Sequence, residues 1–282
     1  MTEVGGGLRA LSTCGLDVLD GYAQDAVCPG GRGQVLAPWP NRLEGGRYEY
    51  GGVAATAALD EPAAGNAIHG LVRWIRWEVE SPAPNLAVAR CVLAPQPGYP
   101  WGLAFELSYV VGRDPLLRVD VSVTNTGEVA ARAPLGLGFH PYLHAGEGGV
   151  DTARLTVPAA TRLLADERGI PRAAVPVGGS EYDFRGGPAL GALRLDDCFT
   201  DLPPDWSVWL ERRDGLTFEL FTEGKWPYVM CFSGDTLAQP ERRRGLAVEP
   251  MTCPPNALRT GESLIGLDPG ESWRGSWGIR ER

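Results

Sequence analysis

The feature that most constrains the fold is an alternation of apolar and polar residues with a period of two. In Leu116–Thr126 (LLRVDVSVTNT), apolar side chains occupy every second position from Leu117 to Val123. Successive side chains of a strand point to opposite faces, so this pattern predicts a strand with one buried face. The segment Leu103–Val111 alternates in the same way. The turn sequence GRDP between the two segments predicts a β-hairpin.

Similar runs recur along the chain, and sustained helical periodicity is nearly absent. With 38 glycines and 24 prolines in 282 residues, turn residues are abundant. Many short strands joined by such turns predict an all-β fold, a large antiparallel β-sandwich. Nothing in the composition marks a boundary, so we expect a single domain over residues 1–282, with loop-rich segments at 29–70 and 159–204. The other predicted strands are Val72–Glu80, Leu86–Leu93, Arg154–Val157, Val208–Arg212, Leu216–Thr222, Tyr228–Ser233 and Ser272–Ile279.

Charge and composition exclude several classes of function. The net charge of −9 disfavours binding to nucleic acid or to anionic membranes, and no apolar run reaches the length of a membrane helix. The first residues lack a basic segment followed by an apolar stretch, so a cytoplasmic location is expected. The six cysteines form no CxxC pair, which leaves a zinc site unsupported and predicts reduced thiols. The exposed edges of a large sandwich are compatible with a homodimer.

Three histidines and one late glutamate are the candidates for acid–base chemistry. His140 precedes Pro141, which interrupts strand pairing and would place the imidazole at a sheet rim. His69 lies between a loop and a predicted strand, and His144 fits a structural role better. Glu249 follows a short apolar run, where partial desolvation would tune a carboxylate as a base. Each residue alone is equally compatible with a structural role.

Polar candidates for substrate binding lie in two loops. Arg42 follows Asn41 in PWPNRL, and a guanidinium suits multiple contacts with hydroxyl or carboxylate groups. Asp196 and Asp197 lie in RLDDCF. An arginine or an acidic residue in a loop is often only solvated, so the residues alone leave both interpretations open.

Taken in order, the short motifs of the chain resemble those of the aldose 1-epimerase (galactose mutarotase) family. They are NR at Asn41, NxIHG around His69, GxxFHPYL around His140, LDDxF around Asp196, and VEP at Glu249. The resemblance extends from about Pro38 to the C-terminus. It implies a large antiparallel β-sandwich of the galactose mutarotase-like type, called a supersandwich.

The resemblance also implies an activity and a set of roles. The family interconverts the α and β anomers of free aldoses by acid–base ring opening and closure, with a monosaccharide as substrate and without a metal or redox cofactor. By position in the motifs, Glu249 matches the general base and His140 the general acid. His69, Arg42 and Asp196 match the residues that bind the sugar. We expect an ionised Glu249 facing a protonated His140 across the sugar ring.

Departures from the family pattern bear on which sugar is used. Asp197 stands where galactose mutarotases often carry a histidine, Met251 replaces a polar residue, and Phe139 replaces a small one. It also stays open whether Asp196 or Asp197 faces the sugar. Two alternatives remain: a mutarotase for hexose phosphates or other anionic sugars, and a carbohydrate-binding protein without turnover. The candidate anion contacts are Arg73, Arg76 and Arg242–Arg244, and the candidate stacking platforms are Trp39, Trp74, Trp101 and Trp226.

Overall fold

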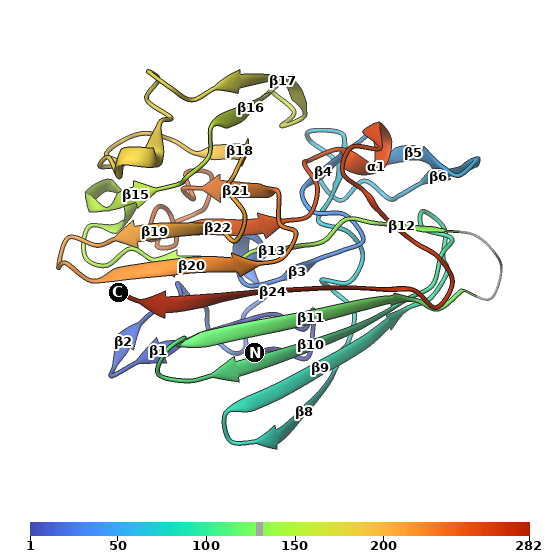
Figure 1. Cartoon of the computed structure of the whole chain (residues 1–282), viewed down its shortest axis with the longest axis horizontal. Helices are drawn as coiled ribbons and strands as arrows, with labels where there is room; N and C mark the ends of the chain where they lie inside the picture. The colour runs from blue at the N-terminus through green and yellow to red at the C-terminus, as the bar shows by residue number, and fades with distance from the viewer. Residues whose placement is uncertain (128–131) are drawn as a thin grey trace.

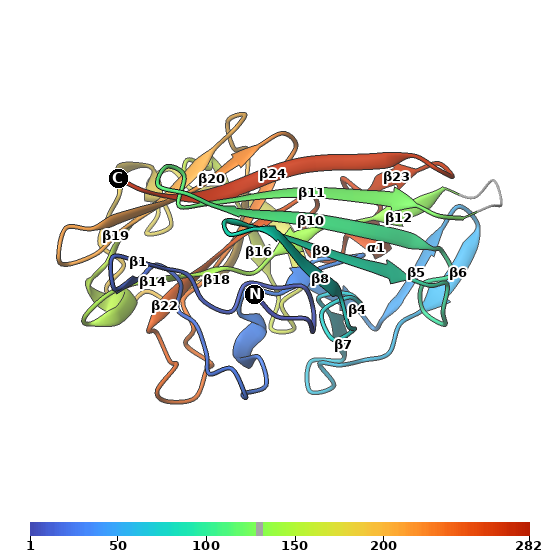
Figure 2. The same ribbon diagram turned by 90° about the horizontal axis from the view of Figure 1, so that it is seen from below.

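The computed structural model describes residues 1–127 and 132–282, and it confirms the predicted all-β antiparallel fold. Two large sheets dominate the molecule, and their strand pairs are antiparallel. In Figure 1, the strands β9, β10, β11 and β24 lie side by side as one long twisted ribbon. Strands β18, β21 and β22 belong to the other sheet. Figure 2 shows the long strands of the first sheet crossing over the second.

The first sheet has eight strands in the order β15-β19-β20-β24-β11-β10-β9-β8. At its centre is the predicted hairpin, in which Val123 pairs with Phe105 and Val119 with Tyr109. Its strands are β8 (Glu78–Ala83), β9 (Leu86–Leu93), β10 (Leu103–Val111), β11 (Leu117–Asn125), β15 (Arg154–Thr156), β19 (Ser207–Glu211), β20 (Thr217–Glu223) and β24 (Ser272–Glu281).

The second sheet has the order β17-β16-β18-β21-β22-β13-β3, and β14 pairs with β22 beside β13. Pro141 separates β13 from β14, so the predicted interruption of strand pairing next to His140 is confirmed. The strands are β3 (Val35–Leu36), β13 (Gly138–Phe139), β14 (Tyr142–His144), β16 (Thr161–Ala165), β17 (Pro171–Pro176), β18 (Asp196–Thr200), β21 (Tyr228–Phe232) and β22 (Gly245–Met251).

Short elements connect and cover the sheets. Four two-stranded ribbons are formed by β1 (Ser12–Thr13) with β2 (Leu16–Asp17), β4 (Arg42–Glu44) with β7 (Asn66–Ile68), β5 (Arg47–Tyr50) with β6 (Val53–Thr56), and β12 (Ala133–Leu135) with β23 (Ile265–Leu267). The helical turns are α1 (Ala257–Thr260) and the 3-10 segments η1 (Pro29–Gly31), η2 (Gly149–Thr152) and η3 (Phe184–Gly186). No helix among these residues is long and apolar enough to cross a membrane.

The core lies between the two sheets. Phe139 of β13 meets Trp277 of β24 with ring centroids 5.3 Å apart, so residues of opposite sheets pack directly against each other. In β22, Leu246 and Val248 belong to this core, whereas Glu249 faces the other side of the sheet. All seven residues of β22 are buried, because loops cover its outer face. A carboxylate on that face is therefore kept away from water.

Strand prediction from alternation is confirmed for most of the first sheet and is incomplete in the second. The strand β9 has the predicted bounds, and β10 and β11 match within one residue. The predicted run Val72–Glu80 forms a strand only from Glu78. The segments 29–70 and 159–204 also contain β3–β7 and β16–β18. Most of these strands have five residues or fewer, which is too short for a clear period-two signal. The longer β17 is exposed over most of its length, so it shows no buried face.

The alternation yields a stability prediction. Phe105 is 2% exposed and packs against Trp77, so Phe105→Ala should lower the free energy of unfolding by about 3–5 kcal/mol. The adjacent Glu106 points to solvent and pairs there with Arg90, so Glu106→Ala should cost less than about 1 kcal/mol. Denaturant unfolding followed by tryptophan fluorescence measures both. Equal effects of the two substitutions would show that the faces of β10 are assigned wrongly.

Candidate active site

A cavity of about 490 Å³ lies on the outer face of the second sheet. It is bounded by β18, β21 and β22, by the loop after β13, and by the N-terminal segments around η1, β4 and β7. All five residues singled out from the motifs line it: Arg42, His69, His140, Asp196 and Glu249. Its volume lies in the range of small-molecule sites in proteins. Sequence-distant segments therefore meet at one concave place.

His140 and Glu249 contact each other in the floor of this cavity. The Nε2 atom of His140 lies 3.3 Å from Oε1 of Glu249, and the side chains are only 5% and 2% exposed. Among the described residues, Nδ1 of His140 and Oε2 of Glu249 have no hydrogen-bond partner. Nδ1 of His140 and Oε2 of Glu249 could therefore each form one further hydrogen bond.

Burial opposes both charges of the pair. Desolvation, together with the nearby cations Arg32 and Arg73, lowers the pKa of His140 to about 3. Desolvation also raises the pKa of Glu249 well above its usual value, and the negative charge of Asp196 adds to this shift. The sequence predicts an ionised Glu249 and a protonated His140 across a sugar ring. Burial in this cavity instead favours a neutral imidazole and a carboxylic acid.

The second histidine of the site is held by the backbone. His69 adopts a left-handed backbone conformation with φ of 63°, and Gly70 follows with φ of 70°. The backbone N–H of Asn41 donates to Nδ1 of His69 over 3.2 Å. Because desolvation keeps the pKa of His69 well below its ordinary value, the neutral ring carries its proton on Nε2. His69 is therefore a hydrogen-bond donor at this atom, next to the ring of His140.

Arg42 is held between two carboxylates at the cavity rim. Its Nε lies 3.1 Å from Oε2 of Glu61, and its Nη1 lies 3.3 Å from Oδ2 of Asp196. Gly169 packs against the guanidinium so closely that a Cβ there would lie 2.4 Å from Nη1. The guanidinium of Arg42 and the carboxylates of Glu61 and Asp196 therefore place hydrogen-bond donors and acceptors side by side, where they could bind several hydroxyl groups of one ligand.

The structure separates the two aspartates of β18. Asp196 lines the cavity. Asp197 is buried and forms an ion pair with Arg162, in which Oδ1 of Asp197 lies 2.6 Å from Nη2 of Arg162. Consecutive residues of a strand point to opposite sides, so only one of them can face the site. The cavity-facing residue is Asp196.

Several cavity residues were missed from the sequence. Asp60 and Phe232 line the cavity, and Phe232 contributes an aromatic wall. Arg73, which is one of the candidate anion contacts, also lines the cavity and forms an ion pair of 2.6 Å with Asp60. None of the four tryptophans considered as stacking platforms lines the cavity. Trp39, Trp101 and Trp226 are core residues. Phe232 could have been found only from the pairing of β21 with β18, because Phe232 lies opposite Asp196 in that pairing.

The other arginines considered as anion contacts lie elsewhere. Arg76 pairs with Glu3 at the surface, Arg243 with Asp151 and Asp235, and Arg244 with Asp20. His144 also lies outside the cavity, where it accepts a hydrogen bond from the backbone of Gly146. Within residues 1–127 and 132–282, no group of three or more His, Cys, Asp or Glu side chains is arranged to hold a metal ion.

Comparisons with known proteins identify the family and the fold. The family model described as aldose 1-epimerase matches residues 1–280. The Escherichia coli (strain K12) protein YihR is 32% identical over 275 residues, covering 97% of this chain and 87% of YihR. A galactose mutarotase-like protein from Clostridium acetobutylicum has a TM-score of 0.85 at 18% identity, with 99% and 90% of the two chains covered. Galactose 1-epimerase from Lactobacillus acidophilus NCFM has a TM-score of 0.81 at 17% identity, with 99% and 89% covered.

Burial of His140 leads to a pH prediction. In the unliganded protein its imidazole should stay neutral as the pH falls through 6.5, where an exposed histidine titrates, because desolvation lowers its pKa. Long-range ¹H–¹⁵N spectra distinguish neutral from charged rings, and His→Gln variants assign the three histidines. The same ring should titrate near pH 6.5 in the urea-unfolded chain. A folded-state midpoint near 6.5 would refute the burial argument.

Proposed function

The chain belongs to the aldose 1-epimerase family, and on that premise we propose that it interconverts the α and β anomers of a free aldose. The observation that carries the proposal is the 3.3 Å contact between Nε2 of His140 and Oε1 of Glu249 inside the cavity. A proton donor and a proton acceptor that touch each other can both reach one pyranose ring bound above them. General acid–base catalysis requires this proximity.

In the proposed mechanism, the carboxylate of Glu249 takes the proton of the anomeric hydroxyl. The C1–O5 bond breaks, a C1=O1 double bond forms, and the ring oxygen receives the proton of the His140 imidazolium. The open aldehyde then rotates about C1–C2. The same two groups return their protons in the reverse sense, and the ring closes on the other face. No electrons are gained or lost, so the reaction needs no redox cofactor.

The pair holds one proton in total throughout the cycle. The cyclic sugar reacts with a carboxylate and an imidazolium, whereas the open aldehyde accompanies a carboxylic acid and a neutral imidazole. Burial favours the second state. Transfer of one proton along the 3.3 Å contact converts one form into the other. The neutral pair that burial favours can therefore reach the reactive charged form without exchanging protons with solvent.

The remaining cavity residues would bind and orient the sugar. Arg42, Glu61 and Asp196 offer donors and acceptors at one side, and the Nε2–H of His69 offers a donor beside His140. We propose that His69 binds the sugar hydroxyl next to the reacting centre and stabilises the developing aldehyde oxygen. A preorganised donor in a desolvated site is effective at such a position.

A second candidate is mutarotation of a phosphorylated or other anionic sugar. One observation favours it: Arg73 lines the cavity, and its buried Nε has no partner among the described residues. The charge balance favours the neutral sugar. Arg73 is already paired with Asp60, and Arg42 with Glu61 and Asp196. A third candidate, a sugar-binding protein without turnover, would use the same cavity but would not need the His140–Glu249 contact.

Removing the proposed base should abolish turnover. Glu249→Gln keeps the shape of the side chain but cannot accept the anomeric proton, so the catalysed rate should fall at least about 100-fold. Polarimetry of freshly dissolved α-D-glucose, with the buffer rate subtracted, measures it. Glu219→Gln is the matched control, because Glu219 is an equally buried carboxyl of the first sheet. A Glu249→Gln protein that retains most of its activity would sink the base assignment. Wild-type protein that binds sugar without turnover would favour the third candidate.

The choice between neutral and anionic sugars can be tested by an NMR anomer-exchange panel of glucose, galactose, their 6-phosphates and a sulfonated hexose. We expect kcat/KM for the neutral sugars to exceed that for the anionic ones by about tenfold or more, because a further anion would face the carboxylates of Asp60, Glu61 and Asp196. The opposite preference, lost in Arg73→Gln, would establish the anionic alternative.

A further inference from the structure

The imidazole of His140 has no hydrogen bond at Nδ1 among the described residues. Catalytic histidines are commonly oriented through the nitrogen that does not react, which here is Nδ1. The ring is nevertheless buried and aimed with Nε2 at Glu249. No protein group among the described residues therefore orients the ring through Nδ1.

The ring of Tyr142 lies parallel to the imidazole. The two ring planes differ by only 3°, and their centroids are 5.1 Å apart, which is an offset stack. The two residues are only two positions apart, with His140 between β13 and β14 and Tyr142 at the start of β14. Tyr142 is 1% exposed, and its hydroxyl donates to the carbonyl of Gly30 over 2.8 Å. The tyrosine is thus fixed at both ends.

A buried arginine completes the arrangement. The guanidinium carbon of Arg32 lies 4.5 Å from the centroid of the Tyr142 ring, a cation–π contact. Arg32 also pairs with Asp20 at 2.8 Å, and the two side chains are only 2% and 1% exposed. We call these three residues, Arg32, Tyr142 and His140, the histidine stack. A desolvated cation next to an aromatic face holds that face strongly in place.

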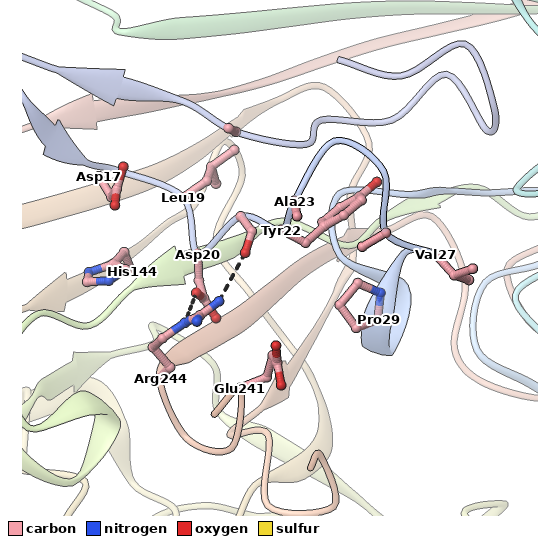
Figure 3. Close-up of a pocket in the computed structure, with 13 residues that line it drawn as sticks. Asp17, Leu19, Asp20, Tyr22, Ala23, Val27, Pro29, His144, Glu241 and Arg244 are labelled. Atoms are coloured by element: carbon pink, nitrogen blue, oxygen red, sulfur yellow. Dashed lines mark hydrogen bonds and ion pairs between the residues drawn. The ribbon is translucent and has the colours of Figure 1, made fainter. Parts of the chain in front are cut away.

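Asp20 ties the stack to a second cavity on the molecule. Asp20 and Arg244 line a second cavity, of about 650 Å³. Figure 3 shows the guanidinium of Arg244 next to the carboxylate of Asp20. Arg244 also donates to the carbonyl of Gly21 over 3.0 Å. Asp20 therefore binds two arginines, one buried and one half-exposed. Loss of Arg32 would leave Asp20 with Arg244 as its partner.

The loop that carries Arg32 also shapes the place of the imidazole. Gly31 has a φ of 74°, and a Cβ on it would lie 2.8 Å from Cδ2 of His140. The backbone N–H of Gly33 donates to the carbonyl of His140 over 2.8 Å, and the N–H of His140 donates to the carbonyl of Gln34 over 3.1 Å. The glycine-rich segment PGGRG thus packs against His140 on one side while Tyr142 stacks on the ring.

We propose that Tyr142 and Arg32 are positioning residues, which hold the imidazole of His140 by stacking so that its Nε2 stays on Glu249 and on the substrate. The inference rests on the proposed mutarotation, because it assigns His140 the acid role. Neither residue lines the cavity of the site, so neither would touch the sugar. A misplacement of a reacting group by about 1 Å can cost about 100-fold in rate.

The proposal is tested by kcat, KM and pH profiles of four variants. Tyr142→Phe keeps the ring, and Tyr142→Leu removes it. Tyr109→Leu is the matched control, because Tyr109 is also buried and donates its hydroxyl to a backbone carbonyl, that of Gly6, but lies in the first sheet. Arg32→Met removes the cation while keeping an unbranched side chain.

We expect Tyr142→Leu to lower kcat about 10- to 100-fold with KM changed less than about threefold, and Tyr142→Phe to keep kcat within about threefold. Tyr109→Leu should keep the kcat of the folded protein. A Tyr142→Leu protein with wild-type kcat would overturn the proposal, as would a Tyr142→Phe protein as slow as Tyr142→Leu.

The pH profile of Arg32→Met distinguishes an effect on His140 from a general loss of stability. The groups facing His140 are Glu249, His69, Tyr142, Arg32 and Arg73, and the charge of Arg32 lowers the pKa of His140. Its removal should shift the limb of the pH profile governed by His140 to higher pH. An unchanged profile would refute the role of Arg32.

Histidine ¹H–¹⁵N spectra separate this inference from the proposed function. The His140 resonance should move in Tyr142→Leu and Arg32→Met, but not in Tyr109→Leu, whether or not a sugar is turned over. If the wild-type protein exchanges no anomers, the mutarotase proposal fails, and the spectra still decide the stack. A His140 resonance that is unmoved in both stack variants would overturn it.

Discussion

The structure depends on the exclusion of water from one imidazole and one carboxyl group. A charge in a desolvated place is unfavourable unless it is paired. His140 and Glu249 meet this constraint together, since a single proton shared across 3.3 Å leaves the pair neutral overall in either of its two forms. The proposed chemistry needs the charged form for the cyclic sugar and the neutral form for the open one. A buried pair is suited to this exchange because its proton count does not change.

The sheet architecture provides this burial. The core between the sheets takes the inward side chains of β22, and the loops around η1, β4 and β7 cover its outward side chains. A carboxylate on an ordinary outer face of a sandwich would be solvated and would keep its usual pKa. The long N-terminal segment, which contributes little to either large sheet, therefore has a physical role: it converts an outer sheet face into a cavity.

The first sheet could be predicted because each of its central strands has one buried face and one exposed face. The alternation in Leu117–Asn125 shows which side chains are inside. The strand β22 carries no such pattern, since all its residues are buried, and only the family motif around Glu249 identified it as part of the site. The choice between Asp196 and Asp197 required the register of β18 against β21. Asp60 and Phe232 could not be found, because their proximity to the other site residues arises from the packing of segments far apart in sequence.

The motif around His140 contains more physical information than its match to a family. Proline ends the pairing of β13 and starts β14 one residue later, so positions 140 and 142 lie on the same side of the chain. The tyrosine then stacks on the histidine, and the arginine of PGGRG stacks on the tyrosine. An acid that must donate to a ring oxygen needs an immobile ring whose reactive nitrogen is not occupied by the residues that position it. Stacking on Tyr142 holds the ring without occupying Nε2, which remains available to Glu249 and to the substrate. A second carboxylate on Nδ1 would instead hold the imidazole charged and weaken it as a proton donor.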